Sequence, residues 1–401
     1  LTAGAAALAA AGGATAAWLL RGDRDRTPRT SPYGIPYAAP VAHPTAGVAP
    51  RALWQVDGLA KDGPGPLATG PVVVAGHAPG LRAWTQDTGR PAWTWRGTPV
   101  GPLLTAGRGR TPLLLVADRA GGVTAVNART GKRSWSESSE PGVRLLAADD
   151  HSLYVLDANR RVTALALDAE GRTRWTSAYR AGGKAPVAAA VARDRLLVVT
   201  REGTAVALNT ATGARSWDRD LGGPLLGTPE GATAPAASAG VFCVGGSSLA
   251  VLDATHGKVR WSHPAEDVGA WAAPLAADGA VYAARQGDLE EGELAAYDLA
   301  DGAPRWTCRL RFAAEVMGDP PVPGGPAVLE GNALVIPLGA ERKAVLDTSR
   351  TDLGIATLDA RTGRHLWTGT DDDPQIGWHL TAAAGRVFTH RRTRLTAHPS
   401  L

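Results

Sequence analysis

The feature that most constrains this chain is a short phrase that recurs along most of its length. Seven copies align by eye, and each carries a small or β-branched residue, usually Asp or Asn, then Gly, then Trp four residues after the Gly. The copies end at Trp93, Trp135, Trp175, Trp217, Trp261, Trp306 and Trp367. Successive tryptophans lie roughly 40 positions apart, and a period of that size is the signature of a repeat architecture.

The segment 143–178 indicates what one repeat builds. Four runs, "VRLLAAD", "SLYVLD", "RVTALALD" and "RTRWTSA", are separated by turns that contain Asp, Asn and Gly. Short strands rich in Val, Leu and Tyr between such turns indicate antiparallel β-structure. Four strands in about 40 residues make one propeller blade. No convincing helical period follows residue 50, which disfavours an α/β fold.

The phrase has a definite place in such a blade. Its alternating residues form the third strand, and its Gly makes the tight turn, at the position that needs a positive φ. The Trp lies on the fourth strand, where its indole covers the neighbouring blade and buries about 150–250 Å². We expect the indole N–H to donate to a turn carbonyl of that neighbour.

Two fragments complete the ring. Near the start, "RALW" ends at Trp54 and is a fourth strand without a third strand before it. The chain ends with "RLTAHPSL" from Arg394, a third strand with no tryptophan after it. We therefore predict an all-β, eight-bladed β-propeller of four-stranded antiparallel blades, closed by a blade shared between the N- and C-termini. Such closure leaves no exposed edge strand to aggregate.

The repeated pattern resembles the tryptophan-docking motif of the PQQ-like, or quinoprotein-type, β-propellers. The resemblance covers residues 51–401, and seven copies in register make it specific for the fold. The family includes quinoprotein alcohol dehydrogenases and BamB-like assembly factors. Because the motif is a packing device, the resemblance implies an architecture more strongly than an activity.

The N-terminal region predicts that the protein lies outside the cytoplasm. Residues 1–20 carry no charge and are rich in Ala and Gly, as expected of a membrane-spanning or signal segment. Residues 21–50 are Pro-rich and fit an extended linker to the propeller at 51–401. We expect a membrane-tethered or secreted protein with further sequence upstream. This plan resembles that of actinobacterial receptor-type serine/threonine kinases, whose sensor regions include PQQ-like propellers.

Charge and cysteine content narrow the function further. The chain has 42 basic and 38 acidic side chains and no interleaved basic and aromatic patch, so a nucleic-acid partner is not expected. The two cysteines, Cys243 and Cys308, fall on a second and a fourth strand of neighbouring blades. Such strands are too far apart to bridge, so two free thiols are expected.

The family resemblance raises an enzymatic alternative, a PQQ-dependent quinoprotein dehydrogenase. Such enzymes hold PQQ and a calcium ion in the central funnel, often beside a disulfide between adjacent cysteines, and use Asp as the catalytic base. No two cysteines are adjacent here, and no set of Glu, Asn and Asp stands at the starts of the inner strands. We therefore predict no catalytic residues, no PQQ, no calcium and no other metal.

Ligand-binding residues are sought at the funnel, because the first strand of each blade lines the channel in this fold. The candidates are Arg144, Lys184, Trp271, Trp378 and His379. Trp271 and Trp378 are extra to the repeat and occupy equivalent places in their blades. Aromatic surface beside polar groups suits sugars, peptides or flat ligands. Packing at the channel mouth is the alternative interpretation, and a hydrogen-bonded structural histidine is the alternative for His379.

Taken together, the sequence favours a non-catalytic, extracytoplasmic and monomeric propeller. It would bind a protein, peptide or cell-wall ligand, or act as a scaffold, one form of which is the sensor region of a membrane-anchored kinase. The alternatives are the PQQ enzyme and a BamB-like assembly factor, although the lipid-accepting Cys of that factor is missing after the apolar segment. Two insertions, at 286–293 and 339–352, add loops to the regular scaffold and are either functional or tolerated surface segments.

Overall fold

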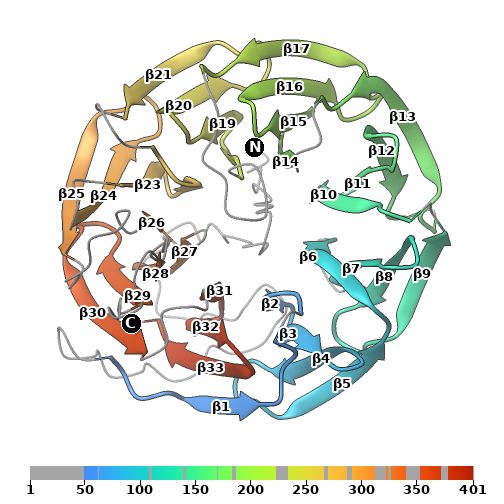
Figure 1. The fold of residues 1–401 in the computed structure, drawn as a ribbon, viewed down its shortest axis with the longest axis horizontal. Coiled ribbons are helices and arrows are strands. Elements are labelled where there is room, and N and C mark those ends of the chain that lie inside the picture. Colours follow the sequence, from blue (N-terminus) through green and yellow to red (C-terminus); the bar gives the residue numbers. More distant parts are fainter. Residues whose placement is uncertain are drawn as a thin grey trace, which may run out of the picture.

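The molecule is a ring of eight β-sheets (Figure 1). The computed structural model describes residues 49–400 except 62, 108–110, 139–140, 169, 183–186, 223–233, 266–269, 287–290, 312–321, 324–326, 340–352 and 372–377. Every regular element in these residues is a strand. Each sheet is a run of four antiparallel strands, and one sheet holds a short fifth strand. The predicted all-β, eight-bladed propeller is therefore confirmed.

The first four blades follow one another along the chain. They comprise β2 (Leu67–Thr69), β3 (Val72–His77), β4 (Gly80–Thr85) and β5 (Pro91–Arg96); β6 (Pro99–Ala106), β7 (Leu113–Asp118), β8 (Gly122–Asn127) and β9 (Arg133–Ser138); β10 (Arg144–Ala148), β11 (Ser152–Leu156), β12 (Arg161–Ala166) and β13 (Thr173–Arg180); and β14 (Val187–Ala192), β15 (Arg195–Thr200), β16 (Thr204–Asn209) and β17 (Arg215–Asp220).

The last four blades complete the circle. They comprise β18 (Ala236–Ser238), β19 (Val241–Val244), β20 (Ser248–Asp253) and β21 (Val259–Pro264); β22 (Leu275–Ala277), β23 (Ala280–Gln286), β24 (Glu291–Asp298) and β25 (Pro304–Arg311); β26 (Val322–Pro323), β27 (Val328–Glu330), β28 (Ala333–Gly339), β29 (Leu353–Asp359) and β30 (His365–Asp371); and β31 (His379–Ala383), β32 (Arg386–Arg391), β33 (Arg394–Pro399) and β1 (Trp54–Asp57).

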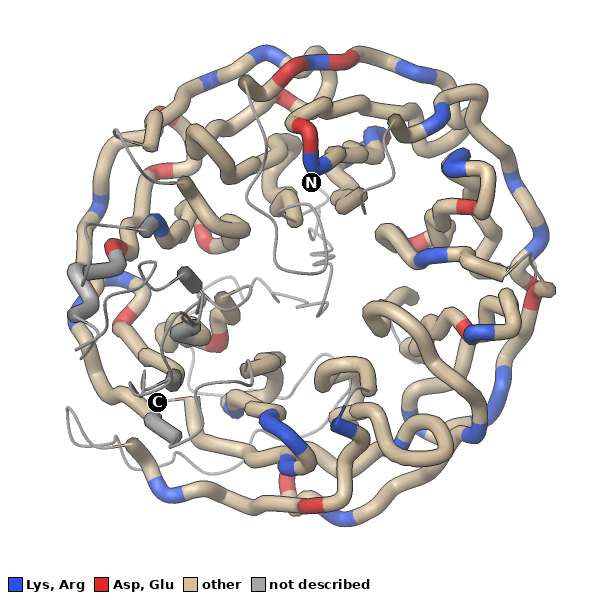
Figure 2. The backbone as a smooth tube through the Cα atoms, in the orientation of Figure 1, with Lys and Arg blue, Asp and Glu red and all other residues tan. Residues whose placement is uncertain are grey.

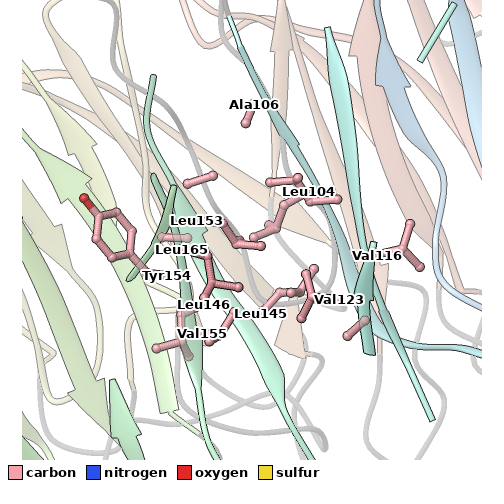
Figure 3. Packing of buried hydrophobic residues seen from close by; sticks show 14 of the residues in the cluster. Leu104, Ala106, Val116, Val123, Leu145, Leu146, Leu153, Tyr154, Val155 and Leu165 are labelled. Carbon is pink, nitrogen blue, oxygen red and sulfur yellow. The ribbon is translucent and has the colours of Figure 1, made fainter. Parts of the chain in front are cut away.

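The core is divided among the spaces between blades. Leu104, Val116 and Val123 of β6–β8 share one cluster with Leu145 and Leu153 of the next blade, and all five are almost completely buried (Figure 3). Neighbouring blades cover both faces of the inner and middle strands. The sequences of these strands are therefore nearly continuous apolar runs. Packing between neighbouring blades therefore buries apolar surface, and this burial is the dominant favourable term in folding.

The repeated tryptophans join each blade to the next. The indole N–H groups donate at 2.8–3.1 Å to backbone oxygens, in the pairs Trp54–Gln86, Trp93–Ala128, Trp175–Thr210, Trp217–Ala254, Trp261–Leu299 and Trp306–Ala360. Each acceptor lies in or beside the turn between the third and fourth strands of the following blade. The glycine of that turn has a positive φ and lies directly against the indole, as Gly213 (φ +71) does against Trp175. A side chain there would collide with the ring.

Two tryptophans depart from this pattern. Within the described residues, the Nε1 atoms of Trp135 and Trp367 are buried without a hydrogen-bond partner. Trp135 still packs on Gly171. That turn is one residue longer than the turn of Gly213, since the Gly171 N–H donates to the Ala166 carbonyl and the Gly213 N–H donates to the Asn209 carbonyl. In the blade that follows Trp367, the third and fourth strands are β33 and β1, which are not consecutive in the chain, and the Trp367 ring lies 5.9 Å from that of His398.

The ring is closed by hydrogen bonds between the two ends of the chain. β1 pairs with β33, with Trp54 opposite Ala397 and Asp57 opposite Arg394. The Arg394 Nε atom lies 2.9 Å from a carboxylate oxygen of Asp57. The predicted blade shared between the termini is therefore confirmed. Leu401, the final residue, lies outside the described residues.

The insertions and cysteines occupy distinct places. The segment 340–352 falls between β28 and β29 but lies outside the described residues. The segment 286–293 lengthens the hairpin of β23 and β24. Cys243 is buried in β19, Cys308 is partly buried in β25, and both are free thiols. Burial raises the pKa of each thiol, which keeps both protonated and unreactive at neutral pH.

Residues 1–48, which hold the apolar segment and most of the Pro-rich linker, lie outside the described residues. Among residues that are described, no helix has the length and apolar character to cross a bilayer.

Candidate functional face and channel mouth

The two faces of the ring carry different kinds of connection. Because strands alternate in direction, each link between blades leaves from the face where the inner strands begin, which we call the variable face. The links on this face differ widely in length, from the short link 97–98 to the long links 221–235 and 265–274. The opposite face carries mainly two-residue turns and the repeated turns of the tryptophan phrase. Binding residues are disproportionately carried on loops that a rigid scaffold positions, so the variable face is the candidate functional face.

Charged residues are distributed unevenly over the ring. Figure 2 shows that Lys, Arg, Asp and Glu gather on the outer strands and the connections, whereas the inner strands are mostly uncharged. Arg144, the first residue of β10, is an exception, since it is exposed at the inner end of its blade. Lys184, another of the predicted funnel residues, falls outside the described residues.

The Trp271 ring packs among buried side chains and is not exposed for binding. Only 1% of its surface is exposed, and its Nε1 donates to the carbonyl of His263 at 3.1 Å. The Tyr297 ring meets it edge-on at 6.0 Å, and the Arg285 guanidinium lies 5.5 Å from its centroid. Arg285 is held there by two hydrogen bonds to Glu293, at 3.0 and 3.1 Å. Of the two interpretations of Trp271, this geometry fits the packing role.

Trp378 and His379 meet residues that sequence reasoning missed. The Arg391 guanidinium lies 5.0 Å from the Trp378 ring, and the exposed His379 stacks on the buried His390 with centroids 5.8 Å apart. Within the described residues, the Trp378 Nε1 atom has no hydrogen-bond partner. The cluster of Trp378, His379, His390 and Arg391 thus exposes part of the Trp378 ring and His379 on the variable face, while His390 and Arg391 are buried. The exposed part offers an aromatic ring and an imidazole to a ligand.

The pKa of His390 is lowered to about 4, first by burial and second by the neighbouring His379, against a hydrogen bond to the Arg392 carbonyl. The folded state therefore keeps this ring neutral between pH 4 and its unfolded value near 6.5, while the unfolded chain takes up a proton. Its stabilising contribution is complete above about pH 6.5 and is lost as the pH falls toward 4. A single group of this kind contributes at most about 1.4 kcal/mol per pH unit.

Between pH 7 and pH 5, the free energy of unfolding should decrease less in His390→Gln than in wild type. Urea unfolding at the two pH values measures the difference. Part of the pH dependence should persist in this variant, because burial also lowers the pKa of His398. The matched control is His379→Gln, because His379 is exposed and its loss should leave most of the slope in place. Equal slopes in wild type and His390→Gln would contradict the assignment.

The described residues do not assemble the side chains that the quinoprotein resemblance implies for PQQ and calcium. Among the described residues, no three His, Cys, Asp or Glu side chains come together in a way that could hold a metal ion. The cysteines are in different blades, so neither can form the disulfide of adjacent cysteines that the quinoprotein resemblance implies. We derive no chemical step through that cofactor.

Comparison with known proteins identifies the family to which the chain belongs. The family model described as outer membrane protein assembly factor BamB matches residues 47–167, 158–307 and 245–397. An outer membrane protein assembly factor BamB from Yersinia pestis is 26% identical over 331 residues, which are 74% of this chain and 77% of that protein.

Solved structures share the ring at much lower identity. BamB from Moraxella catarrhalis superposes with a TM-score of 0.54 at 15% identity, covering 88% of this chain and all of that one. The quinohemoprotein alcohol dehydrogenase ADHIIG from Pseudomonas putida gives 0.50 at 11% identity, covering 87% of this chain and 76% of that one. These likenesses concern the fold alone. With the family match extending over nearly the whole ring, the chain belongs to the BamB family of PQQ-like β-propellers.

Proposed function

We propose that this chain is a non-catalytic scaffold propeller that binds a protein partner on its variable face. The observation that carries the proposal is the asymmetry of the ring, in which one face is built mostly from short turns and the other carries links of very different length. The family match supports the proposal, since its named members are assembly factors.

Site-specific photo-crosslinking of the full chain in its own cells tests the proposal. A photoreactive residue at Arg119 or Arg201, both exposed on the variable face, should trap the same partner protein. Placement at His151 or Arg361, exposed in turns of the opposite face, should trap none. Equal trapping from both faces, or binding of muropeptides and sugars in place of any protein, would overturn it.

The PQQ-dependent dehydrogenase remains the competing function because the fold is shared with a quinohemoprotein enzyme. Titration with PQQ and calcium, followed by quinone absorbance and dye reduction with an alcohol, separates the two. We expect no binding at micromolar PQQ and no turnover. Saturable binding with turnover would make the chain an enzyme and remove the scaffold proposal.

An extracytoplasmic location belongs to the same proposal. It is supported by the uncharged segment 1–20 and the Pro-rich segment 21–50, and by the outer-membrane role in the relative's name. This plan fits either an exported assembly factor or the sensor region of a membrane-anchored kinase. Protease added to intact spheroplasts should degrade the propeller, and complete protection would place it inside the cell.

A further inference from the structure

The closing blade is the blade formed by β31–β33 and β1 (Figure 1). In each of the other seven described blades, a turn of the chain connects the third strand to the fourth. In the closing blade these strands, β33 and β1, come from opposite ends of the chain and are held by their ladder and by the ion pair of Arg394 with Asp57. This blade therefore has one covalent connection fewer to oppose its opening.

The second strand of the closing blade carries an unusual number of polar side chains. β32 has the sequence RVFTHR, and all six of its residues are buried. The second strands of the other blades hold at most one Arg, Asp or His each. Titratable groups thus lie in the closing blade where the other blades bury apolar side chains.

A histidine lies on each face of the closing blade. Phe388 of β32 packs in one cluster with Trp84 of the blade β2–β5, and His390, two residues further along, lies on the same face. His398 of β33 lies on the other face, with its ring 5.9 Å from that of Trp367 in the blade β26–β30. The two histidines therefore occupy the two junctions that this blade makes with its neighbours.

A hydrogen bond fixes the tautomer of each of these histidines. The His390 Nε2 atom lies 3.0 Å from the Arg392 carbonyl, and the His398 ring donates to the carbonyl of Pro50. The bonded nitrogen carries the proton, because a carbonyl can only accept. Among the described histidines, only these two have a buried Nδ1 atom without a hydrogen-bond partner. A second proton would create a buried N–H without an acceptor, which costs free energy.

The titratable neighbours of His390 add to this cost. His379 of β31 stacks on it with centroids 5.8 Å apart, and Arg391 and Arg392 follow it along the chain. All three side chains carry positive charge when they are ionised. Burial first, and His379 second, lower the pKa of His390 to about 4.

The surroundings of His398 are apolar. Besides the Trp367 ring, it faces Val387, which is its partner across the ladder between β32 and β33. Burial lowers the pKa of His398 as well, against its hydrogen bond to the Pro50 carbonyl. No carboxylate lies among the groups that shift the pKa of either histidine.

Two carboxylates act on the closing blade at other points. Glu330 of β27 accepts the Gly385 N–H at 2.6 Å, and Asp87 of the blade β2–β5 attracts Arg386. Burial raises the pKa of Glu330, so this group takes up a proton more readily in the closed ring than in an open one. Its protonation stabilises the closed ring and offsets part of the effect of the histidines.

We propose that the closing blade is an acid-sensitive unit, which detaches from both neighbouring blades between pH 7.5 and pH 5 while the other blades stay folded. Both histidines can take up a proton once the junctions open and water reaches their Nδ1 atoms, so acid favours the open ring. Local opening of one cooperative unit is possible well below the free energy of global unfolding.

The other blades depend on groups that titrate at lower pH. In the blade β18–β21, hydrogen bonds, first that of Arg260, lower the pKa of Asp253 to about 2. Its stabilising contribution is complete above its unfolded value near 4 and is lost only as the pH falls from there toward 2. The range between pH 7.5 and pH 5 therefore acts on the histidines of the closing blade.

Hydrogen exchange of the full chain, measured by mass spectrometry at pH 7.5 and pH 5 and corrected for the intrinsic exchange rate, tests the proposal. Protection of β31–β33 and β1 should fall at least about tenfold, since His390 alone supplies about twentyfold and Glu330 offsets part of it. Protection of β14–β17 should change less than about twofold. An equal fall in the two blades would overturn the proposal.

A variant that combines His390→Gln with His398→Gln should lose this pH dependence in the closing blade. The matched control combines His151→Gln with His256→Gln, since both histidines are exposed in turns of the opposite face, and it should keep the wild-type fall. A tenfold fall that persists without His390 and His398, or one that disappears in the control, would contradict the assignment. If the first variant does not fold, the comparison of blades within the wild-type protein still decides.

Discussion

Replacing Trp175 with Ala is expected to lower the free energy of unfolding by about 3–5 kcal/mol, the range for removing a large buried aromatic side chain. The indole is almost completely buried between two blades, and its Nε1 donates to the Thr210 carbonyl at 2.8 Å. Truncation would leave both a cavity and an unpaired carbonyl. Equilibrium urea unfolding, followed by far-ultraviolet circular dichroism, measures the change.

Substitution by Phe separates the two contributions. Trp175→Phe keeps most of the ring volume and loses the hydrogen bond, which is worth about 1 kcal/mol. Trp367→Phe serves as the control, because the Trp367 Nε1 has no partner within the described residues and has no such bond to lose. A Trp175→Ala variant as stable as wild type would show that the indoles do not join the blades.

Gly213→Ala is expected to destabilise the same junction by about 3 kcal/mol from the opposite side. The φ of Gly213 is +71, and an added Cβ would lie 2.4 Å from the Cε3 atom of Trp175. Left-handed backbone costs a non-glycine residue about 1–2 kcal/mol, and overpacking typically adds 1–3 kcal/mol. Urea unfolding under the conditions used for Trp175→Ala gives the comparison.

Gly385 is the matched control for this experiment. Its φ is +72, but an added Cβ would meet nothing within 4 Å, so Gly385→Ala should cost the backbone strain alone. In a Trp175→Ala background, Gly213→Ala should likewise fall to the cost of strain, since the colliding ring is gone. Equal costs for the two glycine substitutions in the wild-type background would refute the close approach of the indole.

The fold could be read from the sequence because the information that specifies each blade is local. The Gly that needs positive φ, the Asp or Asn of the turn and the Trp all lie within a few residues, as in the run from Asn209 to Trp217. The Asn209 side chain accepts backbone N–H groups at 2.9 and 3.1 Å within that turn. Repetition of the same local rule around the ring then determined the number of blades.

The candidate site was less readable because it depends on pairings between distant residues. His379 stands out in the sequence, but its partner His390 is identified only by the register between β31 and β32. The aromatic excess at Trp271 was visible, but its burial depends on Tyr297, a residue of another strand.

The blade made from both chain ends has a mechanical consequence. Trp54, the first residue of β1, lies opposite Ala397, near the end of β33, so the two termini leave the ladder at the same end. Tension applied between the termini would load the hydrogen bonds one after another, as in unzipping, rather than all together in shear. A pull on both ends should therefore open the circle at this seam at low force, before any single blade unravels.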